Sequence, residues 1–201
     1  MKRTISAMRG PGSLKHNRRA FTAENVDAER TRYNVVYKDE PIKQVYHELF
    51  DDALERYNSK QKRKDRCISD YYEHLRTGKQ EKVFHELIVQ IGDKDNTGVT
   101  TEDGQWAATI LDEYMQDFEK RNPTLRVFGA FLHMDEATPH LHIDFIPYVS
   151  GWKGKGMDTK VSLKQALKAL GFAGGTKKES ELNQWINAEK EQLAAVMERY
   201  D

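Results

Sequence analysis

The chain has 201 residues, of which 38% are hydrophobic and 32% charged, a composition that suits a soluble globular protein with one substantial core. Lysine plus arginine and aspartate plus glutamate each number 32, so the net charge is zero and argues against a globally basic nucleic-acid binder. The single cysteine, Cys67, excludes an intramolecular disulfide framework, and no apolar run approaches the roughly 20 residues needed to span a bilayer. We therefore expect a cytoplasmic protein.

Five segments alternate in the manner of strands, and amphipathic helices lie between them. Strands are expected near residues 3–9, 33–37, 82–91, 125–134 and 140–149. Helices are expected over residues 42–62, 69–76, 103–121, 162–170 and 179–200. The last two strands pair as a hairpin, so the predicted fold is α+β, with a central, mostly antiparallel sheet of about five strands and helices packed on one face. We expect residues 1–175 to form one domain and residues 176–201 to begin a charged helical tail.

The hairpin is the most informative segment, and its connection is expected at Met134–Pro139. In that register His133 lies opposite His140, and Phe131 lies opposite His142. Paired residues and residues two apart along a strand share a face, so the three imidazoles project from one face. The other face is expected to be buried and to contain Phe128, Ala130, Leu132, Leu141, Ile143 and Phe145.

Three neutral imidazoles on one face form a ligand set that leaves coordination positions open, which is typical of a catalytic metal. Asp135 and Glu136 in the connection can orient the ligands or complete the shell. The alternative is a solvated hairpin end with coincidental histidines. Three of the seven histidines of the chain fall within ten residues and beside two acids, which favours the metal site.

Such a metal can polarise a carbonyl, generate hydroxide or hold a phosphate. The chain has neither a His-Glu-x-x-His helix nor the Pro-Cys-x-x-Cys signature of zinc deaminases. Positive charge near the site favours phosphate: six lysine or arginine residues and only three acids occur from Arg9 to Arg32, and the loop after the hairpin carries Lys153 and Lys155. The residues alone therefore indicate a metal-dependent enzyme that acts on phosphate.

Two blocks of sequence resemble one known family. The block HMDEATPHLH, from His133 to His142, resembles the metal-binding motif of MobV (Mob/Pre) plasmid mobilisation relaxases, which belong to the HUH endonucleases. The block KHNRR, which contains His16 and is followed by Asn34, resembles the N-terminal motif of that family. The resemblance covers residues 1 to about 175.

The resemblance implies a DNA endonuclease and transferase that nicks one strand at a plasmid transfer origin, becomes attached to the 5′ phosphate and so initiates conjugative mobilisation. It implies that His133, His140 and His142 hold a divalent ion, Mn²⁺ or Mg²⁺, with support from Glu136, and that His16 is the nucleophile.

Some relatives carry a tyrosine directly after the asparagine, where this chain has Val35. This difference argues against a tyrosine nucleophile at that position, although Tyr33 and Tyr37 flank it.

The implied partner is single-stranded or hairpin DNA of a bacterial plasmid origin, with a coupling protein as a further candidate. We expect the N-terminal cations to line one groove with the loop lysines, and Arg19 to contact a phosphate through its planar fork of donors. The predicted DNA contacts are Lys15, Arg18, Arg19, Asn34, Lys153 and Lys155.

Two rival functions remain open. One is a metal-dependent phosphodiesterase or nuclease without a covalent intermediate. The other is a non-catalytic DNA-binding replication or repressor module with a vestigial metal site.

Overall fold

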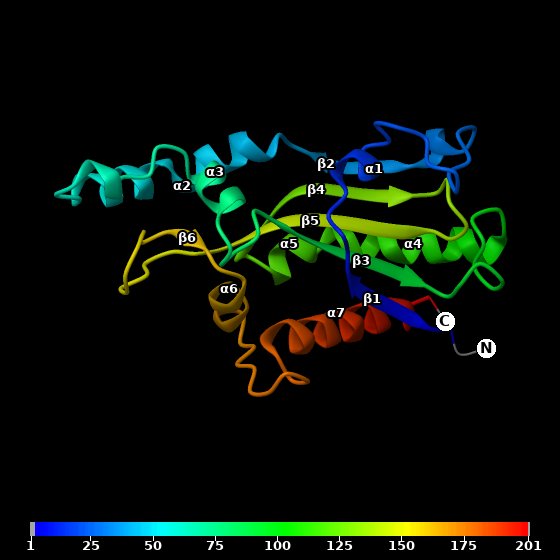
Figure 1. Cartoon of the computed structure of the whole chain (residues 1–201). Coiled ribbons are helices and arrows are strands. Elements are labelled where there is room, and N and C mark those ends of the chain that lie inside the picture. Colours follow the sequence, from blue (N-terminus) through cyan, green and yellow to red (C-terminus); the bar gives the residue numbers. More distant parts are fainter. Residues whose placement is uncertain (1–2, 201) are drawn as a thin grey trace.

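The computed structural model describes residues 3–200 and is built around an antiparallel sheet of six strands (Figure 1). The strands run in the order β1-β3-β5-β4-β2, and β6 pairs with β5 beyond this path. Their bounds are β1 Ile5–Arg9, β2 Val35–Asp39, β3 His85–Ile91, β4 Leu125–His133, β5 His140–Val149 and β6 Lys160–Val161. The five predicted strands and the α+β class are confirmed, and β6 is an addition.

Seven α-helices accompany the sheet within residues 3–200. Their bounds are α1 Leu14–Asn17, α2 Ile42–Ser59, α3 Tyr71–Thr77, α4 Glu102–Gln116, α5 Phe118–Arg121, α6 Leu163–Ala169 and α7 Glu181–Met197. Several begin where a capping side chain accepts a hydrogen bond from the first turn, as Thr101 does from the backbone of Gly104. The helix predicted over residues 103–121 is two helices, because the backbone at Asp117 (φ −103°, ψ 3°) leaves the helical region.

The prediction that the helices lie on one face of the sheet is wrong. Helices α4, α6 and α7 bury the main core against one face, where Ile110, Leu141 and Trp185 meet. Helices α2 and α3 pack on the other face, around Phe128 and Ile146 (Figure 1). The alternation of β5 explains this arrangement, since His140, His142 and Ile146 share a face that is polar at one end and apolar at the other.

The predicted hairpin register is confirmed, because His133 pairs with His140 and Phe131 pairs with His142. The placement of Phe128 in the main core is wrong. The register shifts between Val127 and Gly129, so that Phe128 is the extra residue of a β-bulge and turns to the opposite face. A bulge of this kind leaves no trace in an apolar alternation, so the sequence could not reveal it.

The connection of the hairpin is held by the N-terminal segment through one buried carboxylate. Asp135 accepts hydrogen bonds from Arg19 (2.9 and 2.6 Å), Thr31 (2.9 Å) and Asn34 (2.7 Å). Asn34 also accepts a hydrogen bond from the backbone of Met134. Burial by itself raises the pKa of Asp135, but the hydrogen bonds outweigh it and lower the pKa to about 2.

Helix α7 lies within residues 176–201, the segment expected to begin a tail, yet it contributes to the main core. Trp185 and Leu193 are buried there. The indole nitrogen of Trp185 donates to Asn122 (2.8 Å), and Asn122 donates to Glu189 (3.0 Å). The domain boundary after residue 175 stays a prediction. None of the helices within residues 3–200 has the length and apolar character to cross a membrane.

We expect Trp185→Ala to lower the free energy of unfolding by about 3–5 kcal/mol, because it leaves a cavity beside Phe118 and Phe145. Thermal unfolding followed by circular dichroism measures the change. Asn187→Ala, on the exposed side of the same helix, is the control and should change stability by less than about 0.5 kcal/mol. Equal stabilities of the two variants would show that α7 behaves as a separable tail.

The lowered pKa of Asp135 predicts a dependence of stability on pH. The carboxylate stabilises the fold above its unfolded pKa of about 4, and this contribution, about 2 kcal/mol, is lost as the pH falls towards 2. Urea unfolding between pH 7 and pH 2 should therefore show a steeper acid loss for the wild type than for Asp135→Asn. The exposed Asp95→Asn variant should follow the wild type. Parallel profiles for Asp135→Asn and the wild type would contradict this role.

Candidate metal centre

The ends of β4 and β5 bring the three histidines of the hairpin together. The ring centroids of His133 and His140 lie 5.4 Å apart, those of His133 and His142 lie 4.6 Å apart, and those of His140 and His142 lie 4.9 Å apart. All three side chains are buried. The predicted clustering on one face is therefore present.

Each imidazole is anchored through one ring nitrogen. His133 donates from Nε2 to the carbonyl of Asn17 (3.0 Å), and His140 donates from Nδ1 to the carbonyl of Thr138 (2.8 Å). His142 donates from Nδ1 to the carboxylate of Glu86 (2.6 Å). Since a neutral imidazole carries one proton, the other nitrogen of each ring keeps its lone pair free.

The free nitrogens converge on Glu136. Among the described residues, the buried atoms His133 Nδ1 and His142 Nε2 have no hydrogen-bond partner. His133 Nδ1 lies 3.6 Å from Glu136 Oε1, and His140 Nε2 lies 3.7 Å from the same oxygen. Unpartnered, lone-pair-bearing nitrogens around a carboxylate fit a divalent cation.

The protonation states suit metal binding. Burial, together with the neighbouring His142, lowers the pKa of His140 to about 4 despite the opposing effects of Thr138 and Glu136. Burial also lowers the pKa of His142. Although burial raises the pKa of Glu136, the nearby histidines and Arg19 outweigh it and hold the pKa well below its usual range. At neutral pH, His140 and His142 are therefore neutral imidazoles and Glu136 is an anion.

His16 reaches this cluster from helix α1, far away in the sequence. Its ring centroid lies 5.8 Å from those of His133 and His142. Its Nε2 atom lies 3.1 Å from both Glu136 Oε1 and Arg19 Nη1, of which only one can be its partner in a given tautomer. The ligand atoms of His16, His133, Glu136 and His142 all lie within 4.8 Å of one another. The predicted nucleophile thus lies with Glu136 and two of the three predicted ligands. His140 is not part of this group, although its Nε2 atom lies 3.7 Å from Glu136 Oε1.

The two alternative tyrosines lie elsewhere. Tyr37 donates its hydroxyl to Asp112 of α4 (2.6 Å), on the opposite face of the sheet from the histidines. Burial and this hydrogen bond raise the pKa of Tyr37 far above its usual range. Tyr33 lines a cavity with Gln105 and Thr109 of the same helix. Neither hydroxyl shares the cluster with the imidazoles.

Sequence reasoning missed Glu86, Asp144 and the role of Asn17. Besides His142, Glu86 accepts hydrogen bonds from the backbone of Gly12 (2.7 Å) and from Asn17 (2.8 Å). Asn17 also donates to Asp144 (3.0 Å), whose pKa is raised to about 7 by burial, against the hydrogen bond from Asn17. The available signal was that β3 and β5 are apolar strands that each contain one acid. Alternation along these strands places both acids, Glu86 and Asp144, on the same face as His142.

The predicted DNA contacts have different environments. Arg19, in a left-handed conformation (φ 54°), directs its donors to Asp135, Glu136 and the carbonyl of His16. Arg18 bonds to Asp39 and the carbonyl of Glu40, and Asn34 is bonded at both ends of its amide. Lys15 is exposed beside the site.

The loop lysines lie at the other end of the sheet. Lys153 and Lys155 follow β5, whose first residue is His140 and whose last is Val149. At about 3.3 Å per residue, the length of β5 separates them from the histidines by roughly 30 Å. Figure 1 shows the segment between β5 and β6 at the far end of the sheet from the β4–β5 connection. The structure therefore does not bring these lysines and the N-terminal cations around the histidine cluster.

Comparison with known protein families gives one match that covers most of the chain. Residues 19–194 match the Mob_Pre family, described as plasmid recombination enzyme. No curated protein sequence gives a significant match.

Two solved structures of the MobM relaxase domain (MOBV; Mob_Pre), bound to 22-nucleotide oriT DNA of plasmid pMV158 and to Mn, are similar to this chain. The structure at pH 5.5 has 19% identity and a TM-score of 0.47 over 92% of this chain and 85% of that one. The structure at pH 4.6 has 20% identity and a TM-score of 0.44 over 81% of this chain and 76% of that one. The family match itself spans most of the chain and contains the whole histidine block. The chain therefore belongs to the Mob_Pre family of plasmid recombination enzymes, the family that its histidine motif resembles.

Proposed function

We propose that this protein is a metal-dependent DNA relaxase that nicks one strand at a plasmid transfer origin and becomes linked through His16 to the 5′ phosphate. The observation that carries the proposal is the convergence of His16 with His133, His142 and Glu136 within 4.8 Å. Family membership supports it, as does the description of the MobM domains as bound to oriT DNA and Mn. The proposed partner is single-stranded or hairpin origin DNA in the bacterial cytoplasm, with a coupling protein as a further partner.

His133, His140 and His142 would hold the divalent ion, Mn²⁺ or Mg²⁺, with Glu136 in support. A bound ion withdraws charge from the scissile phosphate and stabilises charge on the departing 3′ oxygen. In each ring, the nitrogen that would not bind the ion donates a hydrogen bond that fixes the ring. The acceptors are Asn17, Thr138 and Glu86. The lone pairs are thereby oriented before any ligand arrives.

His16 supplies the nucleophile in this proposal. An imidazole nitrogen forms a bond to phosphorus while the bond from phosphorus to the 3′ oxygen breaks. The ring releases the proton from its second nitrogen, and the 3′ oxygen takes up one proton to become a hydroxyl. The resulting phosphoramidate retains enough energy for a returning 3′ hydroxyl to reverse the reaction and rejoin the strand.

Arg19 is proposed as a positioning residue. Its guanidinium contacts Glu136 (2.7 Å) and the carbonyl of His16 (2.9 Å), so it fixes the acid and the nucleophile relative to each other. As a donor at 3.1 Å from His16 Nε2, it also favours the tautomer in which that nitrogen accepts a hydrogen bond. Asp135 in turn holds Arg19 through two hydrogen bonds.

The first test is adduct formation with a single-stranded origin oligonucleotide of the cognate plasmid and Mn²⁺. The wild type should give a denaturation-stable protein–DNA adduct on a gel. His16→Ala should lose it by more than about 100-fold, because the nucleophile is absent. Tyr33→Phe and Tyr37→Phe are the matched controls and should retain it.

Other outcomes of this test would identify the rivals. Strand cleavage without an adduct, unchanged in His16→Ala, would indicate a hydrolytic phosphodiesterase. DNA binding that needs no metal, with no nick by the wild type, would indicate a binding module.

The second test concerns the buried acid that anchors His142. Glu86→Gln should weaken Mn²⁺ binding about 10- to 100-fold, because it loses the charged acceptor that orients the ring. Isothermal titration of the metal measures this without any DNA. Glu55→Gln, on the exposed side of α2, is the control with the same chemical change. If Glu86→Gln bound Mn²⁺ as tightly as the wild type, Glu86 would have no role in metal binding.

A further inference from the structure

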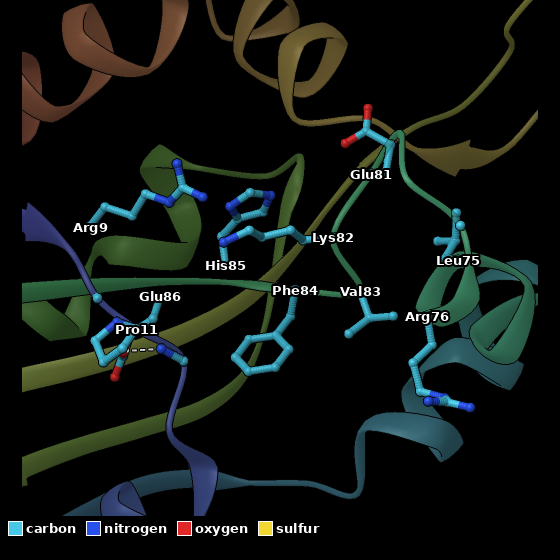
Figure 2. Close-up of a pocket in the computed structure, with 13 residues that line it drawn as sticks. Arg9, Pro11, Leu75, Arg76, Glu81, Lys82, Val83, Phe84, His85 and Glu86 are labelled. Atoms are coloured by element: carbon cyan, nitrogen blue, oxygen red, sulfur yellow. Dashed lines mark hydrogen bonds between the residues drawn. The ribbon is translucent and has the colours of Figure 1, made fainter.

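A second cavity lies where β1 ends and β3 begins, at the edge of the sheet. It has a volume of about 300 Å³ and is lined by residues 9–12, 75–76, 78 and 81–86 (Figure 2). This volume is at the lower end of the range for small-molecule sites. None of the three histidines of the hairpin lines this cavity, and its lining residues come from both faces of the sheet.

One wall of the cavity is cationic. Figure 2 shows the side chains of Arg9, Lys82 and His85 side by side. Neither Arg9 nor Lys82 forms an ion pair with any residue of the described range 3–200. His85 is only 8% exposed, and its Nε2 atom has no hydrogen-bond partner among the described residues. A buried polar atom without a partner is rare in folded proteins, which makes the imidazole of His85 a candidate to bind a polar ligand.

The acids that line the cavity do not neutralise this wall. Glu86 is fully engaged by Gly12, Asn17 and His142. Glu81 interacts with Ser162 and the backbone of Leu163. In Figure 2 its carboxylate lies well apart from the side chain of Arg9. The two cations lower the pKa of His85, in addition to the larger effect of burial, to about 4. An anion is therefore the complement that this wall lacks.

The opposite wall is apolar and aromatic. Phe84 packs edge-on against Phe128, with ring centroids 5.3 Å apart, and Figure 2 shows its ring beside Pro11 and Val83. Gly12 has a positive φ of 77°, and a Cβ at this position would lie 3.1 Å from the ring of Phe84. The glycine thus allows the backbone to approach the aromatic ring closely. An aromatic ring opposite a cationic wall suits a nucleotide, whose base stacks and whose phosphate pairs.

The cavity adjoins the candidate metal centre through one side chain. Glu86 bonds to the backbone of Gly12 through Oε2 and to His142 through Oε1. A ligand in the cavity is therefore separated from the histidine cluster by the thickness of a single carboxylate. A polymer that passes the histidines can place a neighbouring unit in this cavity, whereas the loop lysines after β5 lie too far away.

We propose that the cavity binds one nucleotide of the DNA strand, with its phosphate on Arg9, Lys82 and His85 and its base against Phe84. This subsite rests on the proposed function, because the strand is the proposed substrate. A free nucleotide offers the same chemistry, so the test must separate the two sources.

The test measures binding of a fluorescent single-stranded origin oligonucleotide by anisotropy, without Mn²⁺. Arg9→Ala and Lys82→Ala should each weaken binding about fivefold and should each reduce the slope of log affinity against log salt by about 0.7. Lys79→Ala, which removes the same charge just outside the cavity, is the matched control and should bind as the wild type does. Both cavity variants change exposed residues, so folding should survive.

Imidazole NMR signals give a local measure. The His85 signal should shift on addition of the oligonucleotide, and only weakly with dTMP or inorganic phosphate at equal concentration. The signal of the exposed His47 on α2 serves as the internal reference.

Each contrary outcome has one meaning. An unmoved His85 signal, with Arg9→Ala and Lys82→Ala binding like Lys79→Ala, would overturn the subsite while leaving the relaxase proposal intact. Binding of dTMP as tight as that of the oligonucleotide would overturn the assignment to the DNA strand. Absence of both oligonucleotide binding and adduct in the wild type would instead overturn the proposed function itself.

Discussion

The carboxylate of Glu86 joins three segments of chain that are distant in the sequence. From strand β3 it bonds to Gly12 and Asn17 in the N-terminal segment and to His142 on β5. A buried carboxylate is costly unless its oxygens are paired, so this position is stable only when all three partners are in place. Gly10 permits the approach, because a Cβ there would lie 2.1 Å from the carboxylate. The geometry of the histidine cluster therefore depends on the docking of the N-terminal segment.

The sequence predicted the hairpin well because burial leaves only one acceptable register. Slipping the pairing of His133 and His140 by one residue would turn Leu141 and Ile143 to the polar face, at a large hydrophobic cost. The same alternation could not predict the bulge at Phe128, which depends on packing against α2 and α3. The alternation does place Glu86 on the histidine face, but it does not indicate that Gly12 and Asn17 of the N-terminal segment are its partners.

The N-terminal motif could be recognised in the sequence, but its contacts in the folded protein could not be predicted from it. Nothing in the spacing of His16, Arg19 and Asn34 indicates that Asp135 collects hydrogen bonds from two of them. Part of the local positive charge is therefore paired with acids of the protein itself, because Arg19 bonds to Asp135 and Glu136 in the connection of the hairpin. In a chain of zero net charge, the cations that remain free for a polyanion are those without internal acids, such as Lys15, Arg9 and Lys82.

The contacts that complete the centre are almost all long-range, since His133 bonds to Asn17 and His16 meets Glu136 across more than a hundred residues. An isolated hairpin would bring the three imidazoles together but would leave two of their rings without the acceptors that orient them. A strained backbone at Arg19 persists because Asp135 and Glu136 both hold its side chain, and these bonds exist only in the folded chain. Metal affinity is consequently a property of the whole tertiary structure, and any loosening of the N-terminal segment weakens the ligand set and displaces the proposed nucleophile together.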